Sequence, residues 1–413
     1  MKRRGQNTSA LFSFQKFSYL YFMQPVIIIH HHEITLKGNN RKWFEQKLLK
    51  NVRTALGELV PHSAITGGYG RFVIQLQSES KSELIIERLK YVFGLSNICI
   101  GVKVEQDIDA FTNASLDLLK DEQFKTIRVT TRRADKNFPI GSMEMNAKVG
   151  AAICEKFNVR ANLTGPDETI FIEIADKVAY VYRAKVQGAG GLPSSISGKV
   201  VSLISAGFDS PVASWQMMKR GVTTVFVHFH SMPYTSQNSI DQVKQIVELL
   251  TKYQFKSKLY LVPFADVQNE IVLKTPMPLR VILYRRLMVR IAEAIAFKEK
   301  AEGLVTGEAV GQVASQTLRN IRNIDNAATL PILRPISGND KEETMVIARK
   351  IGTYDISKEP YDDCCSFLAP RKPETWSNFH EIEVAEANLD IPTLIALAME
   401  KQTIEQFSFP QSA

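Results

Sequence analysis

A loop of small residues between a predicted strand and a predicted helix is the clearest candidate for chemistry. The strand covers residues 199–204, the loop reads Ser-Ala-Gly-Phe-Asp-Ser over residues 205–210, and a helix follows from Pro211. Small residues leave backbone N–H groups accessible, and a helix N-terminus adds the positive end of a dipole, so the pattern predicts a phosphate site. An ordinary helix start capped by Asp209 or Ser210 is the alternative, but it does not explain three consecutive small residues. The loop has neither a Walker A Gly-Lys-Ser/Thr nor a G-x-G-x-x-G pattern.

Two adjacent cysteines, Cys364 and Cys365, are candidates for nucleophilic chemistry, which needs a thiolate. They follow Asp362 and Asp363, whose carboxylates should raise the thiol pKa, so reactivity requires a basic neighbour such as Arg371. A buried inert pair and a metal site are the alternatives, and structural zinc is disfavoured because the chain has no second cysteine pair. Four cysteines in all are too few for a disulfide framework, so we expect a reducing, cytoplasmic compartment.

Three consecutive histidines, residues 30–32, suggest a metal site. On a strand their side chains would alternate between two faces, so at most two could bind one ion. We therefore expect surface or RNA-facing histidines and no metal site built by protein groups alone.

The elements of the first half are typical of small α+β domains. Strand patterns cover residues 26–29, 71–76, 126–130, 170–174 and 179–186, and helical spacing covers residues 41–56, 83–92, 110–119 and 146–156. We expect one domain over residues 25–80 and a second α/β domain over residues 81–186.

A linker rich in Gly, Ser and Pro, residues 187–198, separates this half from a different pattern. Beyond it, short apolar strands at 199–204, 223–229, 258–264 and 303–305 alternate with helices at 210–219, 240–253 and 281–297. Such alternation predicts a parallel sheet covered on both faces. Residues 394–406 are predicted to form mostly one helical stretch.

The basic excess of the chain is confined to its first half. Residues 1–200 carry 28 Lys and Arg against 19 Asp and Glu, whereas residues 201–413 carry 23 against 24. One-sided positive charge favours a polyanion-binding module, and a solvated basic surface is the alternative.

Residues 1–24 contain no acid and are read as an extension, either a transit peptide or the result of a mis-set start before Met23. No window reaches the ~18 apolar residues of a membrane helix, so we expect no membrane partner.

Further motifs narrow the family. They occur in a fixed order and comprise residues Glu33–Arg41, Arg132–Pro139, Gly190–Pro193, Leu283–Arg286, Val305–Glu308, Gly311–Thr317 and Pro360–Cys365. Together they resemble the tRNA 4-thiouridine synthetases, the ThiI family, over nearly the whole chain. The loop at 205–210 resembles the PP-loop (S-G-G-x-D-S) of ATP pyrophosphatases, with Ala206 at the position of the first Gly.

The resemblance implies three domains: a ferredoxin-like domain at 25–80, a THUMP RNA-binding domain at 81–186 and a PP-loop ATP pyrophosphatase domain at 199–413. It also implies that ATP adenylates O4 of a tRNA uridine, and that a persulfide sulfur then displaces AMP to give 4-thiouridine. This order is chemically reasonable, since uracil O4 is a poor leaving group and AMP a good one. Family members also pass sulfur to the carrier protein of thiazole synthesis in thiamine biosynthesis.

The resemblance implies site residues as well. The nucleotide contacts would be Leu203, Ile204, Ser205, Gly207, Ser210, His228, Phe229, Arg285, Gly307 and Gln316. The catalytic residues would be Asp209, acting through Mg²⁺ or by orienting the loop, Lys341, Cys364 and Cys365. The alternatives are an ordinary strand-end histidine for His228, a solvated charge for Arg285 and a helix-surface residue for Gln316. Asp340 and Glu343 around Lys341 also fit a capped helix start.

RNA contacts are expected from basic residues of the first half, which would position tRNA by its phosphates and shape. The candidates are Lys37, Arg41, Lys42, Arg132, Arg133 and Lys136, and any one could be an ordinary surface charge.

Only ~40 residues follow Arg371, too few for the rhodanese domain of longer family members. We therefore expect a separate sulfur donor, a cysteine desulfurase. Expected partners are tRNA, that desulfurase, the thiazole sulfur-carrier protein and, because family members are often dimers, a second copy of the chain.

Two alternatives stay open. Sulfur could go mainly to the thiazole carrier protein, or the chain could be a tRNA-binding protein whose loop is disabled at Ala206. The added methyl is tolerable if residue 206 has a negative φ and harmful if φ is positive or a phosphate touches its Cα.

Overall fold

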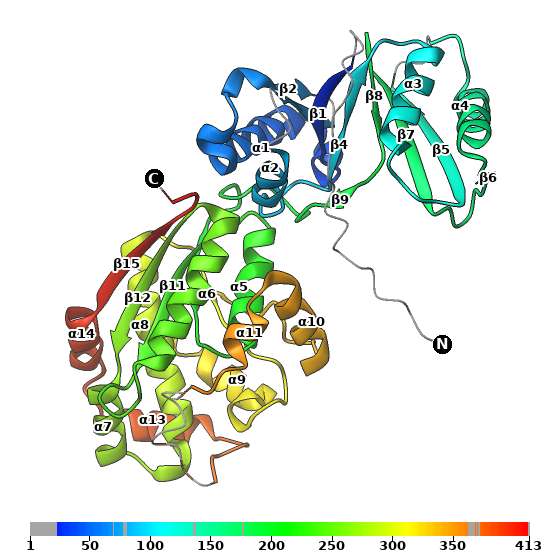
Figure 1. Cartoon of the computed structure of the whole chain (residues 1–413). Coiled ribbons are helices and arrows are strands. Elements are labelled where there is room, and N and C mark those ends of the chain that lie inside the picture. The colour runs from blue at the N-terminus through cyan, green and yellow to red at the C-terminus, as the bar shows by residue number, and fades with distance from the viewer. Residues whose placement is uncertain are drawn as a thin grey trace. The chain divides into compact units, whose positions relative to one another are not determined.

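Figure 1 shows a computed structural model of the chain, which describes residues 23–68, 70–76, 81–134, 138–175, 177–361, 368, 370 and 372–411. The predicted N-terminal extension lies outside these ranges as far as residue 22. The chain divides into two compact units. The N-terminal unit contains the chain up to residue 35 together with residues 58–90 and 95–188, and the C-terminal unit contains residues 36–57, 91–94 and those from 189 onward.

The described strands of the N-terminal unit form one nine-stranded sheet. Its order is β2-β3-β1-β4-β8-β7-β5-β6, and β9 pairs with β4. Neighbours are antiparallel except that β5 runs parallel to β6 and β7. The strands are β1 (Gln24–His30), β2 (Ile65–Gly68), β3 (Arg71–Gln75), β4 (Asn97–Val104), β5 (Thr126–Arg133), β6 (Arg160–Ala161), β7 (Glu168–Ala175), β8 (Val178–Tyr182) and β9 (Val186–Gln187).

The described helices of this unit are α2 (Ser82–Leu89), α3 (Ile108–Leu119) and α4 (Ser142–Phe157), close to their predicted positions. Alternate strand residues such as Ile172 and Val181 share a buried apolar cluster with Phe111 of α3 and Val149 of α4. Because side chains alternate between the two faces of a strand, every second residue of these strands packs against the helices, as the strand patterns predicted.

One predicted strand, residues 179–186, is wrong in its length. β8 ends at Tyr182, which lies opposite Gly101, and pairing with β4 resumes where Val186 lies opposite Ile98. Three residues therefore oppose two, which is a β-bulge and interrupts the ladder. A run of apolar residues cannot reveal this, because the bulge is defined by the partner strand.

The expectation of surface histidines is wrong for two of the three. His31 is buried, and His30 is half-buried, with its Nε2 2.8 Å from a carboxylate oxygen of the buried Glu173. Only His32 is exposed. His30 ends β1 and its partner Glu173 comes from β7, so this hydrogen bond depends on the order of strands in the sheet.

The described strands of the C-terminal unit form a six-stranded sheet in the order β14-β13-β10-β11-β12-β15. The first five run parallel and β15 is antiparallel to β12. The strands are β10 (Lys199–Leu203), β11 (Thr223–His230), β12 (Lys256–Pro263), β13 (Leu304–Val305), β14 (Ile332–Leu333) and β15 (Thr403–Ser408). The helices are α1 (Arg41–Leu56), α5 (Asp209–Lys219), α6 (Asn238–Gln254), α7 (Ala265–Lys274), α8 (Arg280–Glu299), α9 (Leu318–Asp325), α10 (Lys341–Ile351), α11 (Tyr354–Ser357), α13 (Phe379–Glu386) and α14 (Ile391–Lys401).

Helices cover both faces of this sheet, as predicted (Figure 1). On β11, Val225 and Val227 share a buried cluster with α7, α8, α13 and α14, whereas Phe226 between them belongs to a cluster with α5, α6 and α10. Burial on both faces is what makes these strands continuous apolar runs.

The helix predicted over residues 394–406 is wrong at its C-terminal end. α14 ends at Lys401, and Thr403–Ser408 form β15, which adds an antiparallel strand to the edge of β12. The unpaired N–H and C=O groups of an edge strand favour such pairing over a longer helix. None of the helices in the described residues has the length and apolar character that a membrane span requires.

Candidate nucleotide-binding site

The loop at 205–210 is closed by side chains of its own. The Ser205 N–H donates to Ser210 Oγ at 2.8 Å, and the Ser210 hydroxyl lies 3.3 Å from the Ser205 carbonyl oxygen. α5 begins at Asp209, its N-cap is Phe208, and no side chain accepts a hydrogen bond at that cap. Asp209 and Ser210 are therefore not capping residues, and the alternative of an ordinary capped helix start is wrong.

Ala206 fits this loop without strain. Among the described residues, the non-glycine positions with positive φ are Asn158, Ser195, Phe255 and Lys300, so Ala206 has an ordinary backbone conformation. Its methyl group is fully buried in the apolar cluster beneath α5. The methyl group that departs from the PP-loop pattern thus contributes to the core.

Two glycines permit close contacts at the loop. A Cβ on Gly307, just after β13, would lie 2.5 Å from the backbone nitrogen of Ser210 and 2.6 Å from its Cα. A Cβ on Gly207 would lie 2.9 Å from the hydroxyl of Tyr361. The resemblance implies that Gly307 contacts the nucleotide, and the structure shows that Gly307 also lies directly against the backbone of the loop.

Asp209, at the start of α5, is the acidic group of the loop. Gln312 donates a hydrogen bond from Nε2 to its Oδ2 at 3.1 Å. Burial raises the pKa of Asp209, and this hydrogen bond and the positive charge of Lys341 act in the opposite direction. Lys341 is exposed at the first position of α10, which has the predicted capping box between Asp340 and Glu343. The capped helix start and a functional role for Lys341 are therefore compatible, since the positive charge of Lys341 at the start of this capped helix also lowers the pKa of Asp209.

The end of β11 lies beside the loop. His228 is buried and donates from Nδ1 to the Ile204 carbonyl at 3.0 Å, because a carbonyl oxygen can only accept. This fixes the tautomer and leaves Nε2 as the acceptor of the neutral ring. The side chain of Phe229 packs against Phe264 in the core, with ring centroids 5.4 Å apart, and Leu203 packs against the same cluster.

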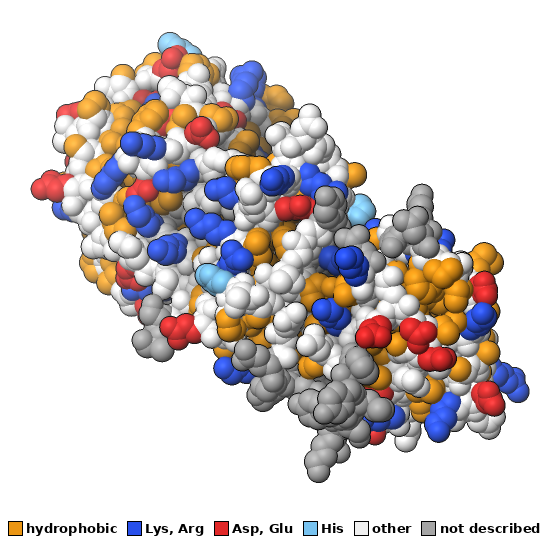
Figure 2. All heavy atoms as spheres, turned by 90° about the horizontal axis from the view of Figure 1, so that it is seen from above, with side chains coloured by type: hydrophobic (Ala, Val, Ile, Leu, Met, Phe, Trp, Pro, Cys, Tyr) orange, Lys and Arg blue, Asp and Glu red, His pale blue; other side chains and the backbone are white. Residues whose placement is uncertain are grey.

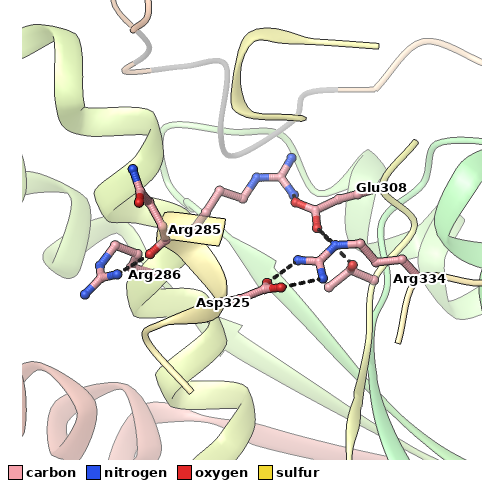
Figure 3. Close-up of polar contacts among 7 residues, drawn as sticks. Arg285, Arg286, Glu308, Asp325 and Arg334 are labelled. Carbon is pink, nitrogen blue, oxygen red and sulfur yellow. Dashed lines mark hydrogen bonds and ion pairs between the residues drawn. The ribbon is translucent and has the colours of Figure 1, made fainter. Parts of the chain in front are cut away.

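Arg285 belongs to a polar network around the buried Glu308, and no sequence pattern predicted this network (Figure 3). Its Nη1 lies 3.5 Å from one carboxylate oxygen of Glu308, which is 3% exposed. The other carboxylate oxygen accepts hydrogen bonds from Arg334 Nε at 2.7 Å and Thr306 Oγ1 at 3.0 Å. Arg334 in turn donates two hydrogen bonds to Asp325. Arg285 is thus held by a carboxylate and is not the solvated charge of the alternative reading.

Gln316 is buried in a short 3₁₀ helix, so the alternative of a helix-surface residue is wrong. Its Oε1 is buried and accepts no hydrogen bond within the described residues. A buried amide oxygen without a donor is costly, and a ligand N–H would satisfy it.

The predicted sulfur-transfer residues Cys364 and Cys365 lie outside the described residues, as does Lys136. The preceding residue that is described, Tyr361, contacts the loop at Gly207, and Ser357 donates to the Gly207 carbonyl at 3.3 Å. By contrast, Cys99 is buried in the N-terminal unit, where burial raises its pKa to about 12, as expected of an inert thiol.

The predicted RNA-binding residues have different environments. Lys37 and Arg41 lie in the C-terminal unit, and Arg41 pairs with Glu45 at 2.9 Å. Arg132 is exposed on β5, whereas Arg133 donates to the carbonyl oxygens of Phe138 and Ile140 at 2.8 and 2.9 Å. Figure 2 shows a face on which Lys and Arg side chains gather toward the left of the view.

Among the described residues, no group of three His, Cys, Asp or Glu side chains is placed to hold a metal ion.

Comparisons with known protein families match almost the whole chain. The model of the ThiI ferredoxin-like domain matches residues 26–99, that of the THUMP domain residues 105–183, and that of the thiamine biosynthesis protein ThiI residues 195–391.

Relatives that match this chain over nearly their whole length point to the same family as the domain models. A protein of Caldanaerobacter subterraneus subsp. tengcongensis named "Probable tRNA sulfurtransferase" is 41% identical over 90% of this chain and 97% of its own length. One of the same name from Coxiella burnetii is 40% identical over 92% of this chain and 98% of its own length. A solved structure described as a 4-thiouridine synthetase–RNA complex with bound ATP is 35% identical, has a TM-score of 0.84, and covers 93% of this chain and all of its own.

Proposed function

The chain belongs to the ThiI family of tRNA sulfurtransferases, and from this premise we propose how its own residues perform ATP-dependent thiolation of tRNA. In the proposed reaction, O4 of a tRNA uridine attacks the α-phosphorus of ATP and pyrophosphate leaves. The terminal sulfur of a cysteine persulfide then attacks C4 of the uridine and AMP leaves, which gives a C4–S–S–cysteine linkage. A second thiol attacks the cysteine sulfur and breaks the S–S bond, so that C4 carries sulfur in place of oxygen. The two thiols end as a disulfide, which an external thiol such as free cysteine reduces. Adenylation is needed because O4 by itself is a poor leaving group.

The loop at 205–210 holds the phosphates of ATP in this proposal. Ser210 keeps the turn closed against Ser205, and Gly307 lets the chain just after β13 pack directly on the start of α5. Lys341 adds positive charge near the departing pyrophosphate. The half-buried carboxylate of Asp209 suits a hard cation, and Mg²⁺ bound there would neutralise phosphate charge.

The nucleoside end of ATP is proposed to lie between the ends of β10 and β11. The backbone at Leu203, Ile204 and Phe229 and the His228 ring would surround the base, and Gln316 would accept a hydrogen bond from it. Arg285, fixed by Glu308, would offer its guanidinium to an anionic group of the nucleotide.

Sulfur transfer is proposed to use Cys364, with Cys365 beside it, because Tyr361 ties the chain three residues earlier to the loop. Sulfur would come from a cysteine desulfurase that transfers it to the thiol as a persulfide. We further propose tRNA and a second copy of the chain as partners, and the cytoplasm as the location.

The observation that carries this proposal is the closed loop at the start of α5, found in a chain that matches an ATP-bound 4-thiouridine synthetase along its length. The test combines purified protein, Mg-ATP, unmodified tRNA, cysteine and a desulfurase, with 4-thiouridine quantified in digested tRNA. The single variants Cys364→Ser and Cys365→Ser are compared, and Cys154→Ser serves as a control thiol. We expect Cys364→Ser to abolish thiolation but to leave adenylation of tRNA intact. Full thiolation by both variants would contradict the sulfur-transfer assignment.

A second activity, sulfur supply for thiazole synthesis, is favoured by the match to the thiamine biosynthesis protein model. We propose the thiazole sulfur-carrier protein as its acceptor. A deletion strain complemented with this chain separates the two outputs, because growth without thiamine and 4-thiouridine in tRNA can be scored independently. The alternative of a loop disabled at Ala206 is not favoured, since that methyl group packs into the core.

A further inference from the structure

A tryptophan is held on the surface of the C-terminal unit by buried polar groups. Trp376 is 69% exposed, whereas Trp215 of the same unit is 4% exposed in the core. The guanidinium carbon of Arg319, on α9, lies 4.5 Å from the centroid of the Trp376 ring. An exposed indole contributes little to folding, so its placement needs another explanation.

The turn that carries this residue, 374–377, is fixed by two asparagines of α9. Asn320 and Asn323 are 0% and 1% exposed. Asn320 donates to the Glu374 carbonyl at 2.9 Å and accepts from the Ser377 hydroxyl at 2.6 Å. Asn323 donates to the Ser377 carbonyl at 3.1 Å. Buried amides with satisfied hydrogen bonds make a rigid support, so the Trp376 backbone has little freedom.

This support connects directly to the nucleotide site. Thr317 caps α9 and its hydroxyl also donates to the Thr375 carbonyl at 2.9 Å, and the residue before it is the buried Gln316. The same stretch supplies Gln312, which donates to Asp209. In Figure 1, α9, which supports the turn, and α13, which follows it in sequence, lie toward the carboxyl ends of the parallel strands. Ligands of parallel α/β sheets bind at that edge.

We propose that Trp376 and Arg319 form a stacking site for an unpaired nucleobase of the tRNA, next to the uridine that reacts. This inference rests on the proposed function. A uridine within a base stack cannot bring O4 to a nucleotide in a loop, so the RNA must be opened there, and flat aromatic and guanidinium faces hold unstacked bases. The exposed Arg322 and Lys372 supply positive charge for the neighbouring phosphates, while Glu374 is occupied by the Trp376 N–H at 2.7 Å.

The test uses full-length Trp376→Ala, Trp376→Phe and Leu318→Ala. Leu318 is the matched control, because it is 70% exposed and precedes Arg319 but has no aromatic ring. We expect Trp376→Ala to weaken tRNA binding roughly 5- to 150-fold, the range of one base–aromatic stack, and to slow adenylation of tRNA equally at low tRNA concentration. Trp376→Phe should retain most of the affinity, and Leu318→Ala should match the wild type. Affinity for ATP alone should be unchanged in all three.

Each contrary outcome has a distinct meaning. If Trp376→Ala binds and adenylates tRNA normally while the wild type thiolates it, this inference fails and the proposed function stands. If Trp376→Ala loses only thiolation, and more desulfurase restores it, the turn docks the sulfur-donor protein and the RNA assignment is overturned. If the wild type neither binds nor adenylates tRNA, the proposed function itself fails.

Discussion

Gly307 is the residue whose substitution tests the site most directly. Gly307→Ala would place a Cβ 2.5 Å from a backbone nitrogen of the loop, and backbone cannot rotate away as a side chain can. We expect the loop to shift, ATP binding to weaken at least ~10-fold, and the protein to lose about 1–3 kcal/mol of stability. Calorimetric titration with ATP and urea unfolding measure the two effects.

Gly338→Ala is the matched control, because a Cβ there would meet nothing within 4 Å. It should behave as the wild type in both measurements. Unchanged ATP affinity in Gly307→Ala would mean that the packing of Gly307 on α5 does not shape the nucleotide site.

Gln312 should control the pH dependence of adenylation. Burial raises the pKa of Asp209, and the hydrogen bond from Gln312 lowers it again by favouring the ionised form. Gln312→Ala removes that stabilisation, so the pKa rises further and activity is lost at a higher pH as the solution is acidified. Lys341→Met should move this acid limb in the same direction, because Lys341 also favours the carboxylate.

The control is Gln237→Ala, since Gln237 makes a similar hydrogen bond to Asp241 at 3.2 Å elsewhere on the unit. Rates of tRNA adenylation measured across pH should show no shift for that variant. An acid limb that stays in place in Gln312→Ala would show that ionisation of Asp209 does not limit the reaction.

At the scale of elements, α8 and α13 are joined by a buried charge cluster. Glu386 of α13 accepts paired hydrogen bonds from Arg286 and Arg290 of α8 at 2.6–2.9 Å. Burial alone would raise the pKa of Glu386, but these two arginines lower it to about 2. Arg286 is 2% exposed and also donates to the Asn323 carbonyl, so the cluster supports the helix that holds the Trp376 turn.

We expect Glu386→Gln to cost about 3–5 kcal/mol at neutral pH, because it leaves the buried Arg286 and the half-buried Arg290 without a counter-charge. The sign of the pH dependence follows from the lowered pKa. The stabilisation is complete above the unfolded-state pKa near ~4.3 and is lost as pH falls toward 2, so the wild type should lose more stability than the variant over that interval.

Urea unfolding at neutral and acidic pH measures both effects, with Glu383→Gln on the exposed side of α13 as the control. Equal acid sensitivity of the wild type and Glu386→Gln would argue against the cluster as the source of the pH dependence.

At the scale of the whole molecule, the basic excess of the first half predicts salt-dependent tRNA binding, and two adjacent arginines test it. Arg132 is exposed, whereas Arg133 supports two backbone carbonyls. Arg132→Ala should weaken tRNA binding and reduce the slope of log affinity against log salt by about one, without a change in stability. Arg133→Ala should instead lower stability by about 1–3 kcal/mol as the carbonyls lose their donor.

Filter binding at several salt concentrations, beside thermal unfolding, separates the two variants. An unchanged salt slope in Arg132→Ala would remove that residue from the RNA interface.

Patterns in neighbouring residues predicted much of this protein. The spacing of apolar residues in 41–56 predicted α1 at its observed bounds, and Asp340 with Glu343 predicted the capping box of α10. The loop at 205–210 was recognised in the same way. Helix periodicity, caps and a strand–loop–helix turn depend on residues within a few positions of one another, and the sequence states those directly.

What only the tertiary structure decided concerns residues far apart in the chain. Gln312 meets Asp209 across 103 positions, Gly307 packs on Ser210, and Glu308 joins Arg285 to Arg334. The bulge between β8 and β9, the strand β15 and the burial of His31 likewise depend on partners that no local pattern names. A single sequence shows which groups can ionise, donate or pack, but the order of strands in a sheet brings particular groups together, because the pairing energy comes from contacts that form only once the chain has folded.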